Sequence, residues 1–409
     1  MSDSVIERSI EPIEGGITAP LGFRAAGVSC GIKASGALDL ALIAADRPAT
    51  AAGMFTTNKV QAAPVIVSRD HFKRSRGRAL AIVANSGCAN AVTGEAGLEV
   101  AREMAAEAGR VLVCASERVL IASTGVIGVP LDGEKVARGI AAAKKALRRE
   151  GHEDAARAIM TTDPFPKSCA VEVRTDAGTF RVGGMAKGAG MIEPNMATML
   201  AFLTTDAKVS APLLRKALAE AVAETFNAIT IDGDTSTNDT VLVLASGASG
   251  VDINDQTYPA LFEGLRAVSR ELALLIVRGG EGATKLVTIR VTGAATQDEA
   301  RRAARTVANS LLVKTAIHGG DPNWGRLVAA AGRAGVAFDL SRCTVRIGPV
   351  VPLDHGVPRD DRAPEAAAVL RERDIEIEID LGTGGPHAAT MWTCDLSAEY
   401  VKINAEYRT

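Results

Sequence analysis

The feature that most constrains the fold is a short apolar run that leads into a loop of small polar residues and then into a helix. Residues 79–84 are all apolar, which predicts a strand buried on both faces. A polar loop follows over 85–94, and a helix is predicted over about 95–113. A strand, a polar loop and a helix in this order are typical of an α/β protein, in which such a loop is a usual place for a functional site. The alternative is a plain turn between the two elements.

The same alternation of strands and helices continues along the chain. Residues 1–20 are predicted to be an irregular lead-in, and an amphipathic helix is predicted to begin after Ser210. The other predicted strands cover 39–44, 63–68, 118–122, 285–291 and 376–380, the last as an edge strand. The other predicted helices cover 132–149, 153–160, 257–278 and 297–309.

Composition excludes several classes of protein. The chain has 409 residues, enough for two or three domains, with 47% hydrophobic and 23% charged residues. The net charge of -2 and the 3% of aromatic residues predict no nucleic-acid partner. No apolar run approaches the roughly 18 residues that span a bilayer. The acidic start of the chain does not resemble a signal peptide. We therefore expect a cytoplasmic protein without a membrane partner.

The cysteines predict neither a metal site nor a disulfide framework. All six are scattered, and no Cys-x-x-Cys pair occurs. They are interpreted as small buried apolar residues, although a catalytic cysteine remains an alternative.

Thr198 is the first candidate nucleophile. It follows a glycine-rich stretch and the turn pair Pro194-Asn195, and it heads the apolar run 199–203. A hydroxyl at the junction of a turn and a buried strand suits a nucleophile. The alternative is an ordinary strand threonine.

Two other short motifs suggest a site. After the predicted strand 118–122, the Thr124 hydroxyl and the Gly125 amide could donate two hydrogen bonds to one oxygen, as an oxyanion hole requires. Glu281 stands between glycines that leave its carboxylate uncovered. A simple turn and an exposed acid after a helix are the respective alternatives.

The central stretch resembles a known family. Gly-Met-Ala-Lys-Gly-Ala-Gly-Met-Ile over 184–192 and Asn-Met-Ala-Thr-Met-Leu over 195–200 look like the self-cleavage and nucleophile motif of the ornithine acetyltransferase family, also called the glutamate N-acetyltransferase family. The resemblance continues through Thr161-Thr162-Asp163, the polar cluster 232–240, Gly-Glu-Gly-Ala-Thr-Lys over 280–285, and the segments 312–326 and 397–409. Pro164 stands where the family usually has Thr.

The resemblance implies a fold, a cleavage and a set of site residues. The expected fold is a mixed αββα sandwich of the N-terminal-nucleophile kind with a smaller C-terminal α/β part. Cleavage between Ala197 and Thr198 would give an α chain of 1–197 and a β chain of 198–409, which share one core. Thr124 and Gly125 would form the oxyanion hole, and His318 is interpreted as a loop histidine. The substrate-binding residues implied by the resemblance are Thr161, Lys187, Thr198, Glu281, Asn404 and Thr409, with Thr162 as the alternative to Thr161.

The implied activity moves the acetyl group of N2-acetyl-L-ornithine to L-glutamate through an acetyl-Thr198 intermediate. No cofactor or metal is expected, and the sequence leaves open whether acetyl-CoA is also a substrate. The family's usual assembly is an α2β2 heterotetramer. Two alternatives remain. One is a self-processing amidohydrolase or aminopeptidase of the related fold, and the other is a non-catalytic amino-acid-binding regulator.

Overall fold

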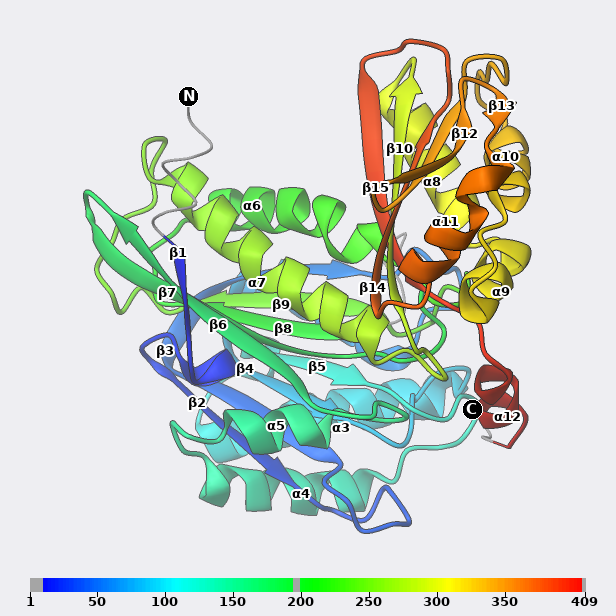
Figure 1. The fold of residues 1–409 in the computed structure, drawn as a ribbon. Helices are drawn as coiled ribbons and strands as arrows, with labels where there is room; N and C mark the ends of the chain where they lie inside the picture. The colour runs from blue at the N-terminus through cyan, green and yellow to red at the C-terminus, as the bar shows by residue number, and fades with distance from the viewer. Residues whose placement is uncertain (1–9, 194–198, 407–409) are drawn as a thin grey trace. The chain divides into compact units, whose positions relative to one another are not determined.

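The computed structural model describes residues 10–193 and 199–406. These residues form two compact units. Of the described residues, the first contains those within 10–227 and 234–276, and the second contains 228–233 and 277–406. Figure 1 shows the elements of both units along the chain.

The first unit alternates strands and helices. Its strands are β1 (Ile10–Ile13), β2 (Phe23–Val28), β3 (Leu40–Phe55), β4 (Arg78–Asn85), β5 (Val119–Ser123), β6 (Lys167–Thr175), β7 (Gly178–Lys187), β8 (Leu200–Thr205) and β9 (Thr240–Ala245). Its α-helices are α2 (Ala63–Ser75), α3 (Gly94–Leu112), α4 (Gly133–Ala146), α5 (His152–Ala158), α6 (Ala211–Glu224) and α7 (Tyr258–Arg278), of which α7 belongs to it as far as Ile276.

The long strand β3 joins two layers of one folded sheet. The strand order is β1-β6-β7-β8-β9-β3-β4-β5, and β2 also pairs with β3. Residues 40–44 and 49–50 of β3 pair with β4, with a register shift between Ala44 and Ala49, whereas residues 50–55 pair with β9. One half of β3 therefore lies with β2, β4 and β5, and the other half lies with β6–β9.

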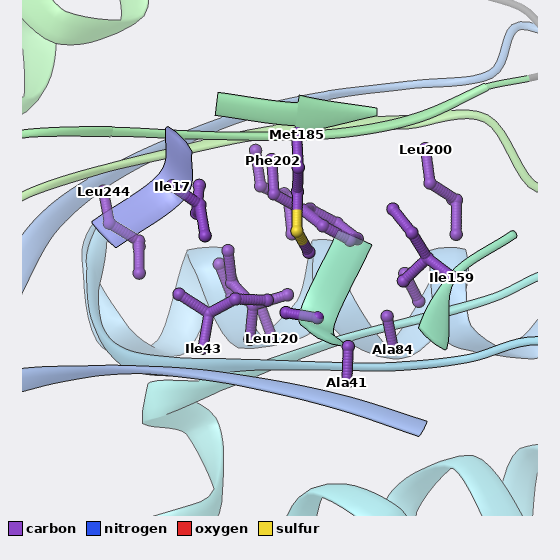
Figure 2. Packing of buried hydrophobic residues seen from close by; sticks show 14 of the residues in the cluster. Ile17, Ala41, Ile43, Ala84, Leu120, Ile159, Met185, Leu200, Phe202 and Leu244 are labelled. Carbon is purple, nitrogen blue, oxygen red and sulfur yellow. The ribbon is translucent and has the colours of Figure 1, made fainter. Parts of the chain in front are cut away.

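An apolar core fills the space between the two layers. Because successive side chains of a strand point to opposite faces, Ala41 and Ile43 face this core, whereas Leu40 and Leu42 face the helices outside. Figure 2 shows the core from close by, with Met185, Phe202 and Leu200 from one layer and Ile43, Leu120 and Ala84 from the other.

Helices cover both outer faces of the folded sheet. Figure 1 shows α6 and α7 over the β6–β9 layer and α3 and α4 over the other layer. Helix α7 approaches β7 so closely that a Cβ on Gly184 would lie 2.9 Å from Leu272 and from Val268. On the opposite side, Met104 and Ile140 pack against the layer that contains β4 and β5. The layers are thus helix, sheet, sheet and helix, and the predicted αββα fold is confirmed.

The second unit is a smaller α/β arrangement, also as predicted. Its sheet has the order β13-β12-β11-β14-β10-β15. The strands are β10 (Leu286–Ala294), β11 (Thr344–Ile347), β12 (Val350–Asp354), β13 (Val357–Pro358), β14 (Asp374–Asp380) and β15 (His387–Cys394). The α-helices are α8 (Gln297–Ala308), α9 (Leu311–Gly319), α10 (Trp324–Gly332), α11 (Ala363–Val369) and α12 (Ala398–Glu406).

Part of the predicted irregular lead-in is a strand, since β1 (Ile10–Ile13) pairs with β6. Two predicted strands were also wrong. Residues 63–68 begin helix α2 and are not a strand, because Ala63, Val67 and His71 are buried at helical spacing and Pro64 suits a first helical turn. The strand over 376–380 is not at an edge, since β14 lies between β11 and β10. Its glutamates face outward and its isoleucines are buried, so one face of an interior strand is open to solvent.

Most other predicted elements are present with bounds shifted by a few residues. Ser210 does occupy the N-cap of α6, but its side chain makes no capping hydrogen bond. All six cysteines are free thiols, three of them buried and three half-buried. Over the described ranges 10–193 and 199–406, no helix combines the length and hydropathy needed to cross a membrane.

Candidate active site

Several strands of the first unit end or begin at one edge of the sandwich. β4 ends at Asn85 and β5 at Ser123, and these two residues are partners in parallel register. In the other layer, Lys187 at the end of β7 pairs with Leu200 at the start of β8. The Nζ of Lys187 lies 3.3 Å from the Oγ1 of Thr124. The two layers therefore meet here through a side-chain contact between two predicted site residues.

The turn at Thr124 and Gly125 accepts only glycine at its second position. Gly125 has φ = +127°, a conformation that other residues rarely adopt. A Cβ on Gly125 would lie 2.4 Å from the backbone carbon of Gly87 and 2.6 Å from the nitrogen of Cys88. The Thr124 amide donates to Asn85 O at 3.0 Å. The turn thus packs directly on the polar loop after β4, which the sequence also indicated as part of a site.

Buried amides hold this turn in place. The Asn238 side chain donates from Nδ2 to Ser123 O at 2.9 Å and to Ala89 O at 2.6 Å. The Ser123 hydroxyl donates to Asn85 Oδ1 at 2.6 Å. Since all of these groups are buried, each lost bond would leave a polar atom without a partner. The polar cluster singled out in the sequence therefore positions the turn through Asn238.

The buried carboxylate of Asp163 interacts with the ammonium groups of Lys167 and Lys187. Asp163 accepts hydrogen bonds from Lys167 Nζ at 2.5 Å, from the Gly188 amide at 2.7 Å and from the Thr161 amide at 3.0 Å. The Asp163 and Lys167 side chains are fully buried. Burial alone would raise the pKa of Asp163, but the ammonium groups of Lys187 and Lys167 outweigh it and lower the pKa to about 2. Burial also lowers the pKa of Lys167.

The same carboxylate links three segments that the sequence treated separately. Asp163 holds the backbone at Thr161, acts electrostatically on Lys187, and fixes the backbone at Gly188 directly after β7. The sequence motif Thr161-Thr162-Asp163 contained this residue, but its role was not predicted. The spacing of Asp163 and Lys167 gave no signal, because opposite charges four residues apart are neighbours on a helix and residues 163–166 are not helical.

Hydrogen bonds fix the backbone at Glu193, before the predicted cleavage bond, and at Met199, after it. The Thr235 hydroxyl donates to Glu193 O at 3.2 Å, and the Thr240 amide donates to Met199 O at 3.0 Å. Met191 has φ = +56°, which is uncommon for a residue other than glycine. The predicted bond Ala197–Thr198 itself lies outside the described residues.

In the second unit, two predicted substrate-binding residues contact each other. Asn404 on α12 donates from Nδ2 to Glu281 Oε2 at 2.8 Å, and Glu281 is buried. Ser397 donates to Gly282 O at 2.7 Å. A Cβ on Gly282 would lie 2.6 Å from the Tyr400 amide nitrogen, so this glycine permits α12 to pack on the segment. The predicted residue Thr409 lies outside the described residues.

His318 was predicted to lie in a loop, and that prediction was wrong. It lies near the end of α9, and its Nδ1 is 2.7 Å from Asp395 Oδ2. Asp395 also accepts from the Thr284 hydroxyl at 2.6 Å and from the amides of Thr284 and Lys285. Burial would raise the pKa of Asp395, but its hydrogen bonds with Thr284, His318 and Lys285 lower it.

No group of three or more metal-ligating side chains is found among the residues that the structure describes.

Comparison with known proteins decides the family. A model described as the ArgJ family matches residues 24–409. The chain belongs to the ArgJ family. The arginine biosynthesis bifunctional protein ArgJ of Symbiobacterium thermophilum is 51% identical over 405 residues, which cover 98% of this chain and 100% of the relative. The protein of the same name from Gloeobacter violaceus is 50% identical over 404 residues, which cover 98% of this chain and 99% of the relative.

A crystal structure from the ArgJ family is also similar. The arginine biosynthesis bifunctional protein ArgJ of Bacillus halodurans matches with 42% identity and a TM-score of 0.50. The match covers 51% of this chain and 100% of the solved chain. The family model and the two full-length relatives confirm the family resemblance seen in the sequence over nearly the whole length of the chain.

Proposed function

We propose that this chain is a glutamate N-acetyltransferase of arginine biosynthesis that moves an acetyl group from N2-acetyl-L-ornithine to L-glutamate. Membership of the ArgJ family supports the reaction. The observation that carries the proposed site is the 3.3 Å contact between Lys187 and Thr124 at the strand ends. Thr198, the proposed nucleophile, directly precedes the segment Met199-Leu200 that enters β8 at this same edge.

The first proposed reaction is self-cleavage. The Thr198 hydroxyl attacks the carbonyl carbon of Ala197, and the peptide bond is replaced by an ester as the nitrogen of Thr198 takes up a proton. Water then hydrolyses the ester, which leaves a carboxylate on Ala197 and a free α-amino group and hydroxyl on Thr198. An α-amino group has a pKa of about 7.7–8.0, so it can accept a proton at neutral pH. One residue would thus supply both nucleophile and base.

The proposed acetyl transfer has two halves. The Thr198 hydroxyl attacks the acetyl carbonyl while its proton passes to the α-amino group, and the developing oxyanion binds at Thr124 and Gly125. The amide bond breaks, the proton passes to the departing nitrogen, and ornithine leaves an acetyl ester on Thr198. The α-amine of glutamate then attacks this ester and regenerates the hydroxyl. The kinetics should be ping-pong.

Substrate recognition is proposed for the other predicted residues. Lys187 suits the α-carboxylate that donor and acceptor share, and Glu281 suits the cationic end of ornithine. Thr161, Asn404 and Thr409 would add neutral hydrogen bonds. These assignments rest on the family resemblance and on the chemistry of each side chain.

Self-cleavage would divide the chain into an α chain of 1–197 and a β chain of 198–409. In support, the whole solved chain of the Bacillus halodurans relative matches only 51% of this chain, about the share of one fragment. We also propose an α2β2 assembly and a cytoplasmic location, which the family resemblance supports. The relatives' printed name, bifunctional, favours a second acetyl donor, for which we propose acetyl-CoA.

The deciding experiment follows ornithine release with and without glutamate. Purified protein is mixed with N2-acetyl-L-ornithine, and Thr198→Ala and Thr198→Ser serve as paired variants. We expect acetylglutamate to form only with the wild type and, more slowly, with Thr198→Ser. Transfer by Thr198→Ala would refute the mechanism. Release of acetate and ornithine at the same rate without glutamate would favour the amidohydrolase alternative.

A further inference from the structure

The proposed reaction poses a recognition problem that its assigned residues do not solve. N2-acetyl-L-ornithine and L-glutamate share an α-carboxylate, but the first ends in an ammonium group and the second in a carboxylate. Glu281, which suits the ammonium group, has the wrong charge for the acceptor's second carboxylate. A further cation is needed at the site, and the first unit contains one beside the Thr124–Gly125 turn.

The backbone at Lys33 is fixed by a buried carboxylate. Asp39 is fully buried and accepts four amide hydrogen bonds, from Cys30 and Ile32 at 2.7 Å, Lys33 at 3.0 Å and Gly31 at 3.1 Å. Consecutive amides converging on one carboxylate hold the segment between β2 and β3 in a single conformation. Lys33 therefore starts from a rigid backbone position.

The side chain of Lys33 lies against the candidate site. A Cβ placed on Gly87 would be 3.1 Å from Lys33 Cγ, and a Cβ placed on Gly125 would be 2.4 Å from the backbone carbon of Gly87. Lys33, Gly87 and Gly125 are thus stacked in contact. The ammonium group of Lys33 donates to Leu38 O at 2.8 Å. An ammonium group has three donors, so it can bind another acceptor in addition.

The charges around Lys33 favour an anion. Lys33 interacts electrostatically with Asp39, Asp163 and Lys187, and Asp163 interacts with Lys167 and Lys187. This linked group holds three ammonium groups and two carboxylates. Both carboxylates are already bonded, Asp39 by backbone amides and Asp163 by Lys167 and two amides. Burial lowers the pKa of Lys33, and a bound carboxylate would oppose that effect.

We propose that Lys33 binds the side-chain carboxylate of the acceptor and so selects a dicarboxylic amino acid. Lys187 binds the α-carboxylate in both halves of the reaction, whereas Lys33 acts only when the acceptor is present. This inference rests on the proposed function. It adds a specificity residue and an acceptor class to the same site.

The test separates the two half-reactions in the wild type, Lys33→Met and Lys33→Arg. Lys145→Met, which removes an exposed lysine of α4, is the matched control. Acetylation of the enzyme by N2-acetyl-L-ornithine is measured in a single turnover. The ratio of kcat/KM for L-glutamate to that for its neutral isostere L-glutamine is then measured. This ratio does not depend on how much of each sample is folded.

We expect Lys33→Met to reduce the ratio at least about tenfold and to leave the acetylation half-reaction within about twofold of the wild type. Lys33→Arg should restore most of the ratio, and Lys145→Met should not change it. An unchanged ratio in Lys33→Met, or an equal loss in both half-reactions, would overturn the inference.

Binding distinguishes failure of this inference from failure of the proposed function. L-glutamate is titrated calorimetrically into the wild type and Lys33→Met, which requires no turnover. Weaker binding to the variant in a protein that transfers no acetyl group would support the carboxylate site and refute the transferase. Equal binding to both, or no binding to the wild type, would overturn the role of Lys33 whatever the activity.

Discussion

At the scale of single residues, the site depends on positions where only one residue type fits. Gly125 is restricted both by its φ of +127° and by the backbone of Gly87, 2.4 Å from where a Cβ would lie. Asp163 is restricted by charge, because it is the buried partner of Lys167. Both restrictions can be tested by single substitutions.

Gly125→Ala should reduce acetyl transfer by at least about 100-fold, the usual effect of removing one oxyanion donor. The added methyl group would push the turn away from Gly87 and misplace the amide. Turnover with N2-acetyl-L-ornithine and glutamate measures the effect. Gly128→Ala is the control, since Gly128 has φ = +79° but open space around its Cβ position. A Gly125→Ala enzyme as active as Gly128→Ala would refute the proposed role of this turn.

Asp163→Asn should destabilise the fold by about 3–5 kcal/mol at neutral pH, because it leaves the Lys167 ammonium buried without its charge partner. Unfolding in urea measures the change. Asp176→Asn, at an exposed position between β6 and β7, should change the free energy of unfolding by less than about 0.5 kcal/mol. A similar small change in both variants would contradict the account of the ion pair.

Protonation of Asp163 should lower the stability of the fold in acid. The pKa of Asp163 is about 2 in the folded chain, against an ordinary value of 3.8. Because the folded value is lower, ionised Asp163 favours folding. This contribution, about 2 kcal/mol, is complete above about pH 5 and is lost as the pH falls from about 4 to about 2. The difference in stability between wild type and Asp163→Asn should therefore be smaller at pH 3 than at pH 5. A difference that grows on acidification would contradict the assignment.

At the scale of elements, helix α2 closes the open edge of the folded sheet. β5 is the last strand in the order, so one side of its backbone has no partner among the described strands. The Ser68 hydroxyl donates to Ile121 O at 2.7 Å and accepts from the Ile121 amide at 2.8 Å. His71 Nδ1 lies 2.8 Å from Val119 O. Side chains of α2 therefore replace a missing strand.

Ser68→Ala should destabilise the fold by about 1–3 kcal/mol, because the amide and the carbonyl of Ile121 would both be buried without a partner. Urea unfolding measures the loss. Ser75→Ala, at the half-buried end of the same helix, should cost less than about 0.5 kcal/mol. If both substitutions lower the free energy of unfolding by the same amount, the hydrogen bonds of Ser68 to β5 do not stabilise this edge of the sheet.

The wrong prediction for α2 shows a limit of sequence patterns. Val65-Ile66-Val67 favours a strand by its β-branched residues, but the partners that make it a helix are in β5, more than 50 residues away. Long, regular elements such as α3 and α7 were predictable because their apolar spacing is local.

The candidate site was partly predictable for the same reason. Thr124, Gly125 and Lys187 stand in short local sequence motifs, and the structure brings Thr124 and Lys187 together. Lys33 and Asn238 were not predicted to take part. Each acts through residues far along the chain, Gly87 for Lys33 and Ser123 for Asn238, and only the fold creates those contacts.

At the scale of the first unit as a whole, elements from both sides of the predicted cut pair and pack with one another. β7 and β8 are paired strands, in which Val182 lies opposite Thr205 and Lys187 lies opposite Leu200. The strands before and after the predicted cut are therefore neighbours. The core between the layers takes Met185 from one side of the cut and Phe202 and Leu244 from the other. Separating the fragments would expose this core.

The two fragments should therefore remain together after cleavage. Native size-exclusion chromatography of the cleaved protein should give one peak that contains both, and only denaturant should separate them. Fragments that elute apart in neutral buffer would contradict the shared core.

The central claim is that Thr198 becomes the N-terminal residue that carries the acetyl group. The most direct test is intact mass spectrometry under denaturing conditions, before and after incubation with N2-acetyl-L-ornithine. We predict two fragments, the second beginning at Thr198 and gaining one acetyl group that disappears when glutamate is added. A single uncut chain of 42.3 kDa that still transfers acetyl groups, or an acetyl group on the first fragment, would contradict the account.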